Sequence, residues 1–327
     1  MQFQRALRSS ALAIVTACSL AALATPASAT TILFVGNSFT YGDPAGGAPL
    51  VQNYKPGTVT DLNGTGIGGV PALFKAFTTE AGLNYEVSLE TSPGKGLDWH
   101  YANRLATIAK PFDKVVLQSY STLDASKPGD PTTLIKYSGL LAQALHDQNP
   151  NVDIRLDSTW SRADQTYLSG GAWYGQSIYQ MALDVRAGYD KADFASSLIS
   201  DVIPVGQAWN RAIAGGLGDA NPFDGIDTGK INLWAPDSYH ASPYGYYLEA
   251  LTMFGNITGL DPRSLGADEL VARDLGISPQ IAVALQGFAS DQLAAEAVPE
   301  PDMAVMFGTV AALMVWARKR KQAKAKA

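Results

Sequence analysis

Ser38 is the first side chain in this sequence that suggests chemistry. It follows a short run of apolar and β-branched residues at 32–35 and then Gly36, within TILFVGNSFTYG. The run predicts a buried strand, and the glycine permits a sharp turn after it. Parallel α/β proteins present a nucleophilic serine in this way, at the C-terminal edge of a strand. The second interpretation is that Ser38 only caps the following helix.

Asp237 and His240 form the second candidate group. In LWAPDSYHASPYG the acid stands three residues before the imidazole, and a helix is predicted to follow at 242–254. The chain has three histidines, and His240 alone is flanked by an acid and by turn residues, unlike His100 and His146. Such an imidazole is either a general base or a surface residue that caps the next helix.

Strands and helices alternate along the part of the chain that must position these groups. Short apolar runs predict five strands, at 32–35, 85–89, 114–118, 152–156 and 201–205. Periodic apolar stretches predict seven helices, at 71–81, 97–109, 132–147, 174–186, 207–214, 242–254 and 278–295. The Gly- and Pro-rich segment 42–69 is too polar and broken to predict regular structure.

This alternation predicts a three-layer α/β/α fold with a mainly parallel, five-stranded sheet. Right-handed crossovers bring the loops after all strands to one edge of the sheet, where ligands bind. Ser38, Gly94 and Gln118 each end or follow a predicted strand. The pattern therefore places all three at that edge.

The N-terminal segment has the pattern of a secretory signal peptide. Residues 1–29 contain two arginines, an apolar run at 11–23 and the small-residue site Ala27-Ser28-Ala29. A lipoprotein signal ending at Cys18 is a rival, although the apolar run continues beyond it. Cys18 is the only cysteine, so residues 30–297 have no disulfide, no thiol nucleophile and no thiolate metal site.

The C-terminal segment 298–327 has the pattern of a second targeting signal. Pro299-Glu300-Pro301 is followed by an apolar stretch at 303–317 and a basic cluster at 318–321. This order resembles the PEP-CTERM sorting signal of Gram-negative bacteria. The resemblance implies export through the inner membrane, transient anchoring there by 303–317, cleavage by an exosortase-type protease, and release to the cell envelope or the medium. An ordinary tail anchor is the alternative.

Charge argues against a nucleic-acid partner. The whole chain carries a net charge of −6, with +2 on residues 1–29 and +4 on residues 298–327, which leaves −12 on residues 30–297. A domain this acidic is a poor ligand for a phosphate backbone. We therefore expect a single exported domain over 30–297 that does not bind nucleic acid.

The motifs resemble those of the SGNH (GDSL-like) hydrolases, in a bacterial branch with GNS in place of GDS. The shared features are GNSFT at 36–40, G-x-x-L-x-x-H at 94–100, VVLQ at 115–118, and D-x-x-H at 237–240 before a final helix. The resemblance covers most of residues 31–262. It implies the flavodoxin-like fold of that superfamily and no metal or organic cofactor.

Residue roles are carried over from this resemblance. It implies that Ser38 is the nucleophile, His240 the general base, and Asp237 the group that orients the imidazole. The backbone N–H groups of Ser38 and Gly94 and the side-chain amide of Gln118 would form the oxyanion hole.

Several positions depart from the family pattern or have two interpretations. Gln118 stands where the family has an asparagine, and Asn37 where it has an aspartate. Gly96 is a rival to Gly94 and is better explained as a turn glycine. Asn37, His100 and Trp160 are possible pocket residues, with structural or core packing as the alternative for the last two.

The resemblance implies an exported serine esterase that works through an acyl-enzyme. The sorting signal favours an acylated carbohydrate or exopolysaccharide as the substrate, with O-acetyl groups as the groups that are removed. A lipase or thioesterase, an acyltransferase with the same three residues, and a non-catalytic glycan-binding envelope protein are the alternatives.

Overall fold

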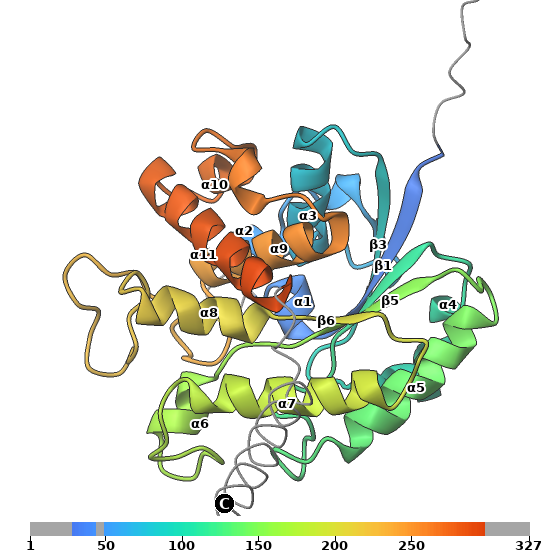
Figure 1. Ribbon diagram of the computed structural model, residues 1–327, viewed down its shortest axis with the longest axis horizontal. Coiled ribbons are helices and arrows are strands. Elements are labelled where there is room, and N and C mark those ends of the chain that lie inside the picture. Colours follow the sequence, from blue (N-terminus) through green and yellow to red (C-terminus); the bar gives the residue numbers. More distant parts are fainter. Residues whose placement is uncertain (1–27, 44–48, 298–327) are drawn as a thin grey trace, which may run out of the picture.

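Six parallel strands form one sheet in the order β2-β3-β1-β4-β5-β6 in a computed structural model, which describes residues 28–43 and 49–297 (Figure 1). The strands are β1 (Thr30–Gly36), β2 (Thr60–Asp61), β3 (Tyr85–Thr91), β4 (Lys114–Leu117), β5 (Asp153–Asp157) and β6 (Asp201–Ile203). Apart from β2, this is the strand order 2-1-3-4-5 of flavodoxin-like folds. The predicted α/β class with a parallel sheet is therefore confirmed.

Helices cover both faces of the sheet, as the crossovers require (Figure 1). One face is covered by α3 (Gly69–Glu80), α8 (Val205–Ala214) and α9 (Pro243–Thr258), and α11 (Pro279–Ala297) packs on the outside of α8 and α9. The other packs against α4 (Leu97–Ile108), α5 (Thr132–His146) and α7 (Gln180–Phe194). Shorter helices are α1 (Ser38–Tyr41), α2 (Pro49–Gln52), α6 (Ala163–Tyr167), α10 (Leu270–Asp274), and the 3₁₀ turns Pro56–Thr58 and Pro262–Leu265.

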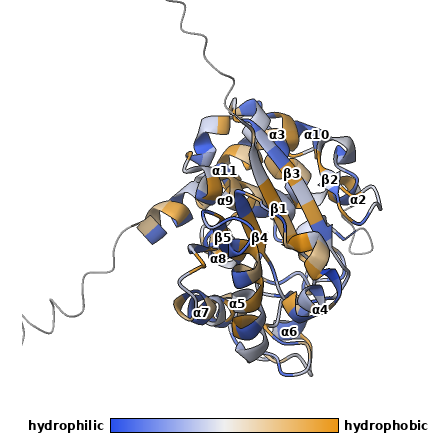
Figure 2. Ribbon diagram, turned by 90° about the vertical axis from the view of Figure 1, so that its right-hand side faces the viewer, coloured by the Kyte–Doolittle hydropathy of each residue, from blue (hydrophilic) through white to orange (hydrophobic). Residues whose placement is uncertain are grey.

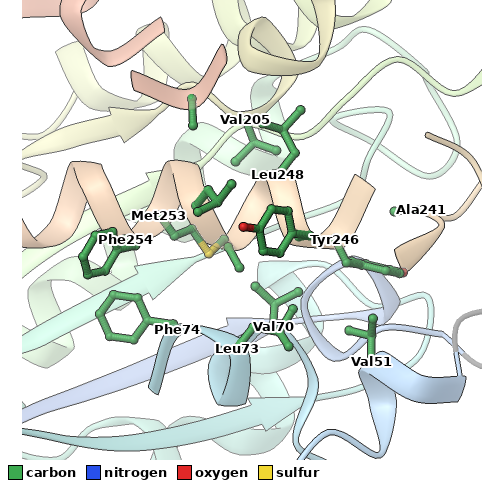
Figure 3. Packing of buried hydrophobic residues seen from close by; sticks show 14 of the residues in the cluster. Val51, Val70, Leu73, Phe74, Val205, Ala241, Tyr246, Leu248, Met253 and Phe254 are labelled. Atoms are coloured by element: carbon green, nitrogen blue, oxygen red, sulfur yellow. The ribbon is translucent and has the colours of Figure 1, made fainter. Parts of the chain in front are cut away.

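The first helical layer contains the larger part of the core. Phe254 of α9 faces Phe74 of α3, and Leu248 lies on the other side of α9 beside Val205 of α8, as Figure 3 shows; all four are fully buried. Hydrophobic colouring along β1 and β4 in Figure 2 reflects strands that are covered on both faces. This packing fixes α9 over the sheet, and α9 follows directly after the predicted acid–base residues.

Strand register sets the place of the site. Gly36 of β1 is level with Thr91 of β3, and Val35 is level with Leu117 of β4. The chain leaves β1 toward β3 on one side and later returns to β4 on the other, so β1 lies at the topological switch point. The residues after β1, β3 and β4 consequently meet at one edge.

Two predictions about the elements were wrong. The sheet has six strands, because Thr60–Asp61 in the supposedly irregular segment 42–69 pairs with the outer edge of β3. The helix predicted at 174–186 begins only at Gln180, since Gly170 and Gly175 have φ of +103° and +77° and the chain turns there. It continues to Phe194, past the predicted end, because buried residues recur along its inner face.

The two predicted targeting signals fall outside the described residues. These are almost the whole signal peptide at 1–29, and the sorting signal at 298–327 with its apolar stretch at 303–317. Within 28–43 and 49–297, no helix is both long and apolar enough to cross a membrane.

Candidate active site

Ser38 is held on a tight turn between β1 and α1. Asn37, not Ser38, caps α1: its Oδ1 accepts a hydrogen bond from the Phe39 backbone N–H at 3.1 Å. Gly36 is required by space and not by an unusual backbone angle, because a Cβ there would collide with the side chains of Thr40 and Gln118. Ser38 is thus left at the first residue of the helix with its side chain free of the capping role.

The structure brings Ser38, His240 and Asp237 into one hydrogen-bonded chain across 202 residues of sequence. His240 Nε2 lies 2.8 Å from Ser38 Oγ, and His240 Nδ1 lies 2.6 Å from Asp237 Oδ2. Ser38 and His240 are 3% and 8% exposed, so both are shielded yet lie at the edge of the sheet. The capping role is taken by Ser242, whose Oγ accepts from Gly245 N, and His240 does not serve as the cap of α9.

Asp237 also shapes the turn that carries the histidine. Its Oδ1 accepts hydrogen bonds from the backbone N–H groups of Tyr239 and His240 at 3.0 and 2.9 Å. Burial alone would raise the pKa of Asp237, but these bonds and the one to the imidazole hold its pKa below the usual value. The carboxylate therefore accepts from Nδ1–H, which leaves Nε2 as the acceptor for the Ser38 hydroxyl.

Tyr246 is a site residue that the sequence motifs did not indicate. Its hydroxyl donates to the Ser38 carbonyl oxygen at 3.0 Å and accepts from the Asp43 backbone N–H at 3.2 Å. It is fully buried on α9, four residues after Ser242. Helix α9 thus contacts the turn at residues 36–38, named the nucleophile turn here after the role predicted for Ser38. Its N-terminal end also follows directly after the loop that carries His240, residues 237–241.

Gln118 does not point its amide toward the nucleophile as an oxyanion donor would. Its Oε1 accepts from the Asn37 backbone N–H at 2.9 Å and from Thr40 Oγ1 at 3.2 Å, and its Nε2 donates to the Ser119 carbonyl. Both ends of the amide are engaged beneath the turn. The oxyanion role predicted for this side chain is corrected to support of the nucleophile turn, because the longer side chain reaches back to the backbone.

The turn backbone expected of Gly96 belongs to Gly94 instead, and the oxyanion role of Gly94 stays a prediction. Gly94 has φ of +65° and open space where a Cβ would be, in the loop after β3. Gly96 precedes α4 and packs against the Tyr120 ring, which a Cβ would strike. The Gly94 loop is tied to the nucleophile turn, because Asn37 Nδ2 donates to the Lys95 carbonyl at 2.9 Å.

The three possible pocket residues are interior residues. Asn37 is 3% exposed and also donates to the Ser119 carbonyl, at 3.1 Å. Trp160 is fully buried and stacks on Phe39, with ring centroids 4.4 Å apart. His100 is fully buried, with Nδ1 2.5 Å from Glu90 Oε2. Core packing and the buried contact with Glu90 favour the structural alternative for Trp160 and His100, and the pocket role of Asn37 stays a prediction.

Comparison with known proteins gives a likeness of fold. No family model and no curated protein matches this sequence. A DUF4886 family protein from Bacteroides uniformis is 16% identical, with a TM-score of 0.55 over 84% of this chain and 99% of that one. This likeness shows a shared fold.

Two further solved structures are more distant. A putative GDSL-like lipase from Parabacteroides merdae is 18% identical, with a TM-score of 0.45 over 70% of this chain and 95% of that one. A member of the lipolytic protein G-D-S-L family from Veillonella parvula is 16% identical, with a TM-score of 0.46 over 71% of this chain and 100% of that one.

Proposed function

We propose that this protein is a serine ester hydrolase with Ser38, His240 and Asp237 as its catalytic triad. The observation that carries the proposal is the continuous chain from Ser38 Oγ through the imidazole to a carboxylate, with contacts of 2.8 and 2.6 Å. A serine hydroxyl is a weak nucleophile at neutral pH and needs such a base. The GNS and D-x-x-H motifs, which resemble those of SGNH hydrolases, support the same assignment.

The mechanism has two steps. Ser38 Oγ attacks the ester carbonyl while its proton passes to His240 Nε2, and Asp237 stabilises the imidazolium that forms. The imidazolium then protonates the leaving alcohol, and an acyl-enzyme remains. Water attacks this ester with His240 again as the base, which releases the acid and restores Ser38.

The oxyanion is assigned to backbone donors. The Ser38 N–H belongs to the first turn of α1, where amide groups have no partner within the helix. Gly94 belongs to a loop that Asn37 holds beside this turn. We assign these two N–H groups to the oxyanion, without Gln118.

Substrate and location are part of the proposal. The acidic domain and the C-terminal pattern that resembles a PEP-CTERM signal favour an exported enzyme that removes O-acetyl groups from a carbohydrate or exopolysaccharide. The transient membrane anchor at 303–317, cleavage by an exosortase-type protease, and an envelope or extracellular destination belong to the same proposal.

A fluorophosphonate probe tests the reaction class. The purified protein should be labelled and should hydrolyse a short-chain aryl acetate, whereas Ser38→Ala should do neither. Release of acetate from an O-acetylated polysaccharide then tests the substrate, and a preference for long acyl chains would favour a lipase or thioesterase. A folded wild-type protein that neither labels nor hydrolyses would contradict the triad and favour the glycan-binding scaffold.

A further inference from the structure

The loop that carries the acid and the base, residues 237–241, is irregular apart from one antiparallel bridge between Trp234 and Ala241. It contains Ser238 at φ of +55°, in the left-handed region that residues other than glycine seldom adopt. Backbone in such a conformation persists only where its surroundings hold it. The groups that contact this loop therefore decide how well His240 is aimed.

Backbone bonds to residues 233–235 and the bonds that Asp237 accepts hold the loop from within. The segment after β5, residues 160–164, adds contacts from another element. Trp160 Nε1 donates to the Tyr239 carbonyl at 3.2 Å, and the Asp164 backbone N–H donates to the Ser238 carbonyl at 3.1 Å. The two bonds reach the backbone carbonyl groups of the two residues that precede His240. The segment thus fixes the path of the loop, although about 75 residues separate the two in sequence.

Arg162 adds a contact to a side chain. Its guanidinium carbon lies 3.6 Å from the centroid of the Tyr239 ring, a close cation–π distance. The same ring contacts the His240 imidazole, with centroids 4.1 Å apart and planes inclined by 31°. Tyr239 therefore connects the guanidinium to the catalytic base.

The guanidinium is itself fixed in place. Arg162 Nε lies 3.0 Å from Asp164 Oδ1 and its terminal nitrogen lies 2.6 Å from Oδ2, so the pair is bidentate. The two side chains are only 15% and 19% exposed. A second terminal nitrogen reaches Ser121 Oγ, after β4, at 3.4 Å. With its charge balanced by Asp164, Arg162 acts here through its position.

We propose that Arg162 is a positioning residue that holds the Tyr239 ring, and through it the imidazole of His240, in line with Ser38. The inference rests on the proposed function. The imidazole must keep Nε2 aimed at Oγ while it gains and loses a proton, and the Tyr239 ring limits its rotation. Arg162 contacts none of Ser38, His240 or Asp237 directly, so its loss should affect turnover more than substrate binding.

Kinetics of five variants test this role. Arg162→Met and Tyr239→Leu should each lower kcat for an aryl acetate by about 10- to 100-fold, because small misplacement of a catalytic group is costly. KM should stay within about twofold. Tyr239→Phe keeps the ring and should retain most activity, and Arg162→Lys keeps a cation over the ring and should recover part of the loss. Arg186→Met, which removes a half-buried arginine paired with Asp190 on α7 and Glu296 on α11, far from the site in sequence, is the matched control.

A double variant adds a test of coupling. If the guanidinium acts through the ring, Arg162→Met with Tyr239→Leu should be no more than about twofold slower than Tyr239→Leu alone. Thermal unfolding of every variant separates misplacement from loss of fold. If Arg162→Met does not fold, the lysine variant and the two Tyr239 variants still decide the question.

Three outcomes would overturn the inference. They are a folded Arg162→Met with wild-type kcat, a rise of KM at constant kcat, which would place Arg162 on the substrate, and strictly additive losses in the double variant. Each leaves the esterase proposal standing. A wild-type protein that resists the fluorophosphonate probe would instead refute the proposed function, and this inference with it.

Discussion

Two histidine–carboxylate pairs stand in the described part of this molecule, an outer pair (His240 and Asp237) and an inner pair (His100 and Glu90), and their contact distances are nearly the same. His240 Nδ1 lies 2.6 Å from Asp237 at the edge of the sheet, and His100 Nδ1 lies 2.5 Å from Glu90 in the interior. Their other nitrogens differ. His240 Nε2 meets the hydroxyl of Ser38, whereas His100 Nε2 is buried without a hydrogen-bond partner in the part of the chain that the structure describes.

Their carboxylates also differ. Asp237 is partly exposed and otherwise accepts only from its own turn. Glu90 is fully buried and also accepts from Arg104 Nε at 2.9 Å, while Arg104 reaches the Leu62 carbonyl at 3.3 Å. The inner pair thus ties α4 and the segment after β2 to β3. A short imidazole–carboxylate contact therefore shows only that the imidazole is held in place. The group that contacts the other ring nitrogen decides whether the histidine can act as a base.

The largest loss of activity should come from removing Ser38 or the imidazole that contacts it. Ser38→Ala and His240→Ala should each lower kcat by about 10⁴–10⁶-fold, because the nucleophile and its base act as a unit. Burst-phase kinetics with an aryl ester would measure this. His146→Ala, at the end of α5, is the control and should retain activity. A loss below tenfold in His240→Ala would break the distinction between the two pairs.

Asp237→Asn should have the next largest effect, about 10⁴-fold in kcat at neutral pH. An amide can still accept from the turn, but it no longer stabilises the imidazolium and it permits the wrong tautomer. Stability should change little, since the carboxylate is partly exposed. Rates and unfolding curves measured on the same sample would show this. A loss of stability with retained rate would place Asp237 in the same structural class as Glu90.

Glu90→Gln should have the opposite effects to Asp237→Asn: a large loss of stability and a small loss of activity. The change should cost about 1–3 kcal/mol of unfolding free energy, because Glu90 is buried and loses its charge-assisted bonds, while Arg104 is 29% exposed and keeps access to water. At permissive temperature kcat should fall less than tenfold, as Glu90 does not contact the triad. Urea denaturation and esterase rates test both parts. A kcat loss above 10³-fold in a folded Glu90→Gln would show that the inner pair takes part in turnover.

The sequence predicted the outer pair better than the inner one for a physical reason. GNS after a strand and D-x-x-H before a helix are local patterns, and a parallel sheet brings strand ends together in a known way. The same logic predicted Gly94 at this edge. The partner of His100 is ten residues earlier on another element, and no local pattern pairs a strand glutamate with a helix imidazole.

The other features that the sequence did not predict depend on tertiary packing. Gln118 occupies the expected place, but the direction of its amide depends on contacts with Asn37 and Thr40 that no spacing encodes. Arg162 and Tyr246 contact the site from other elements, and in the sequence they are ordinary surface and helix residues. Strand β2 forms only because two residues reach the open edge of β3.

A third carboxylate site, with no histidine or arginine, sharpens the comparison further. Asp157 at the end of β5 and Glu249 on α9 are fully buried neighbours, and in the described ranges no N–H or O–H group donates a hydrogen bond to either carboxyl group. Two carboxyl groups can bond only if one keeps its proton. Burial raises the pKa of Asp157 to about 8, and burial with the neighbouring charge raises the pKa of Glu249 well above its usual value.

The sign of the effect follows from proton binding. Between about pH 4 and 8 the folded protein keeps protons on this pair that the unfolded chain releases, so stability falls as pH rises through this range. Glu249→Gln supplies a permanent N–H donor and removes one titration. Its melting temperature should exceed that of the wild type by about 3 °C or more at pH 8 and approach it near pH 4. Glu86→Gln, on an exposed position of β3, is the control. Parallel profiles of melting temperature against pH for the wild type and Glu249→Gln would contradict the proposed protonation of this pair in the folded protein.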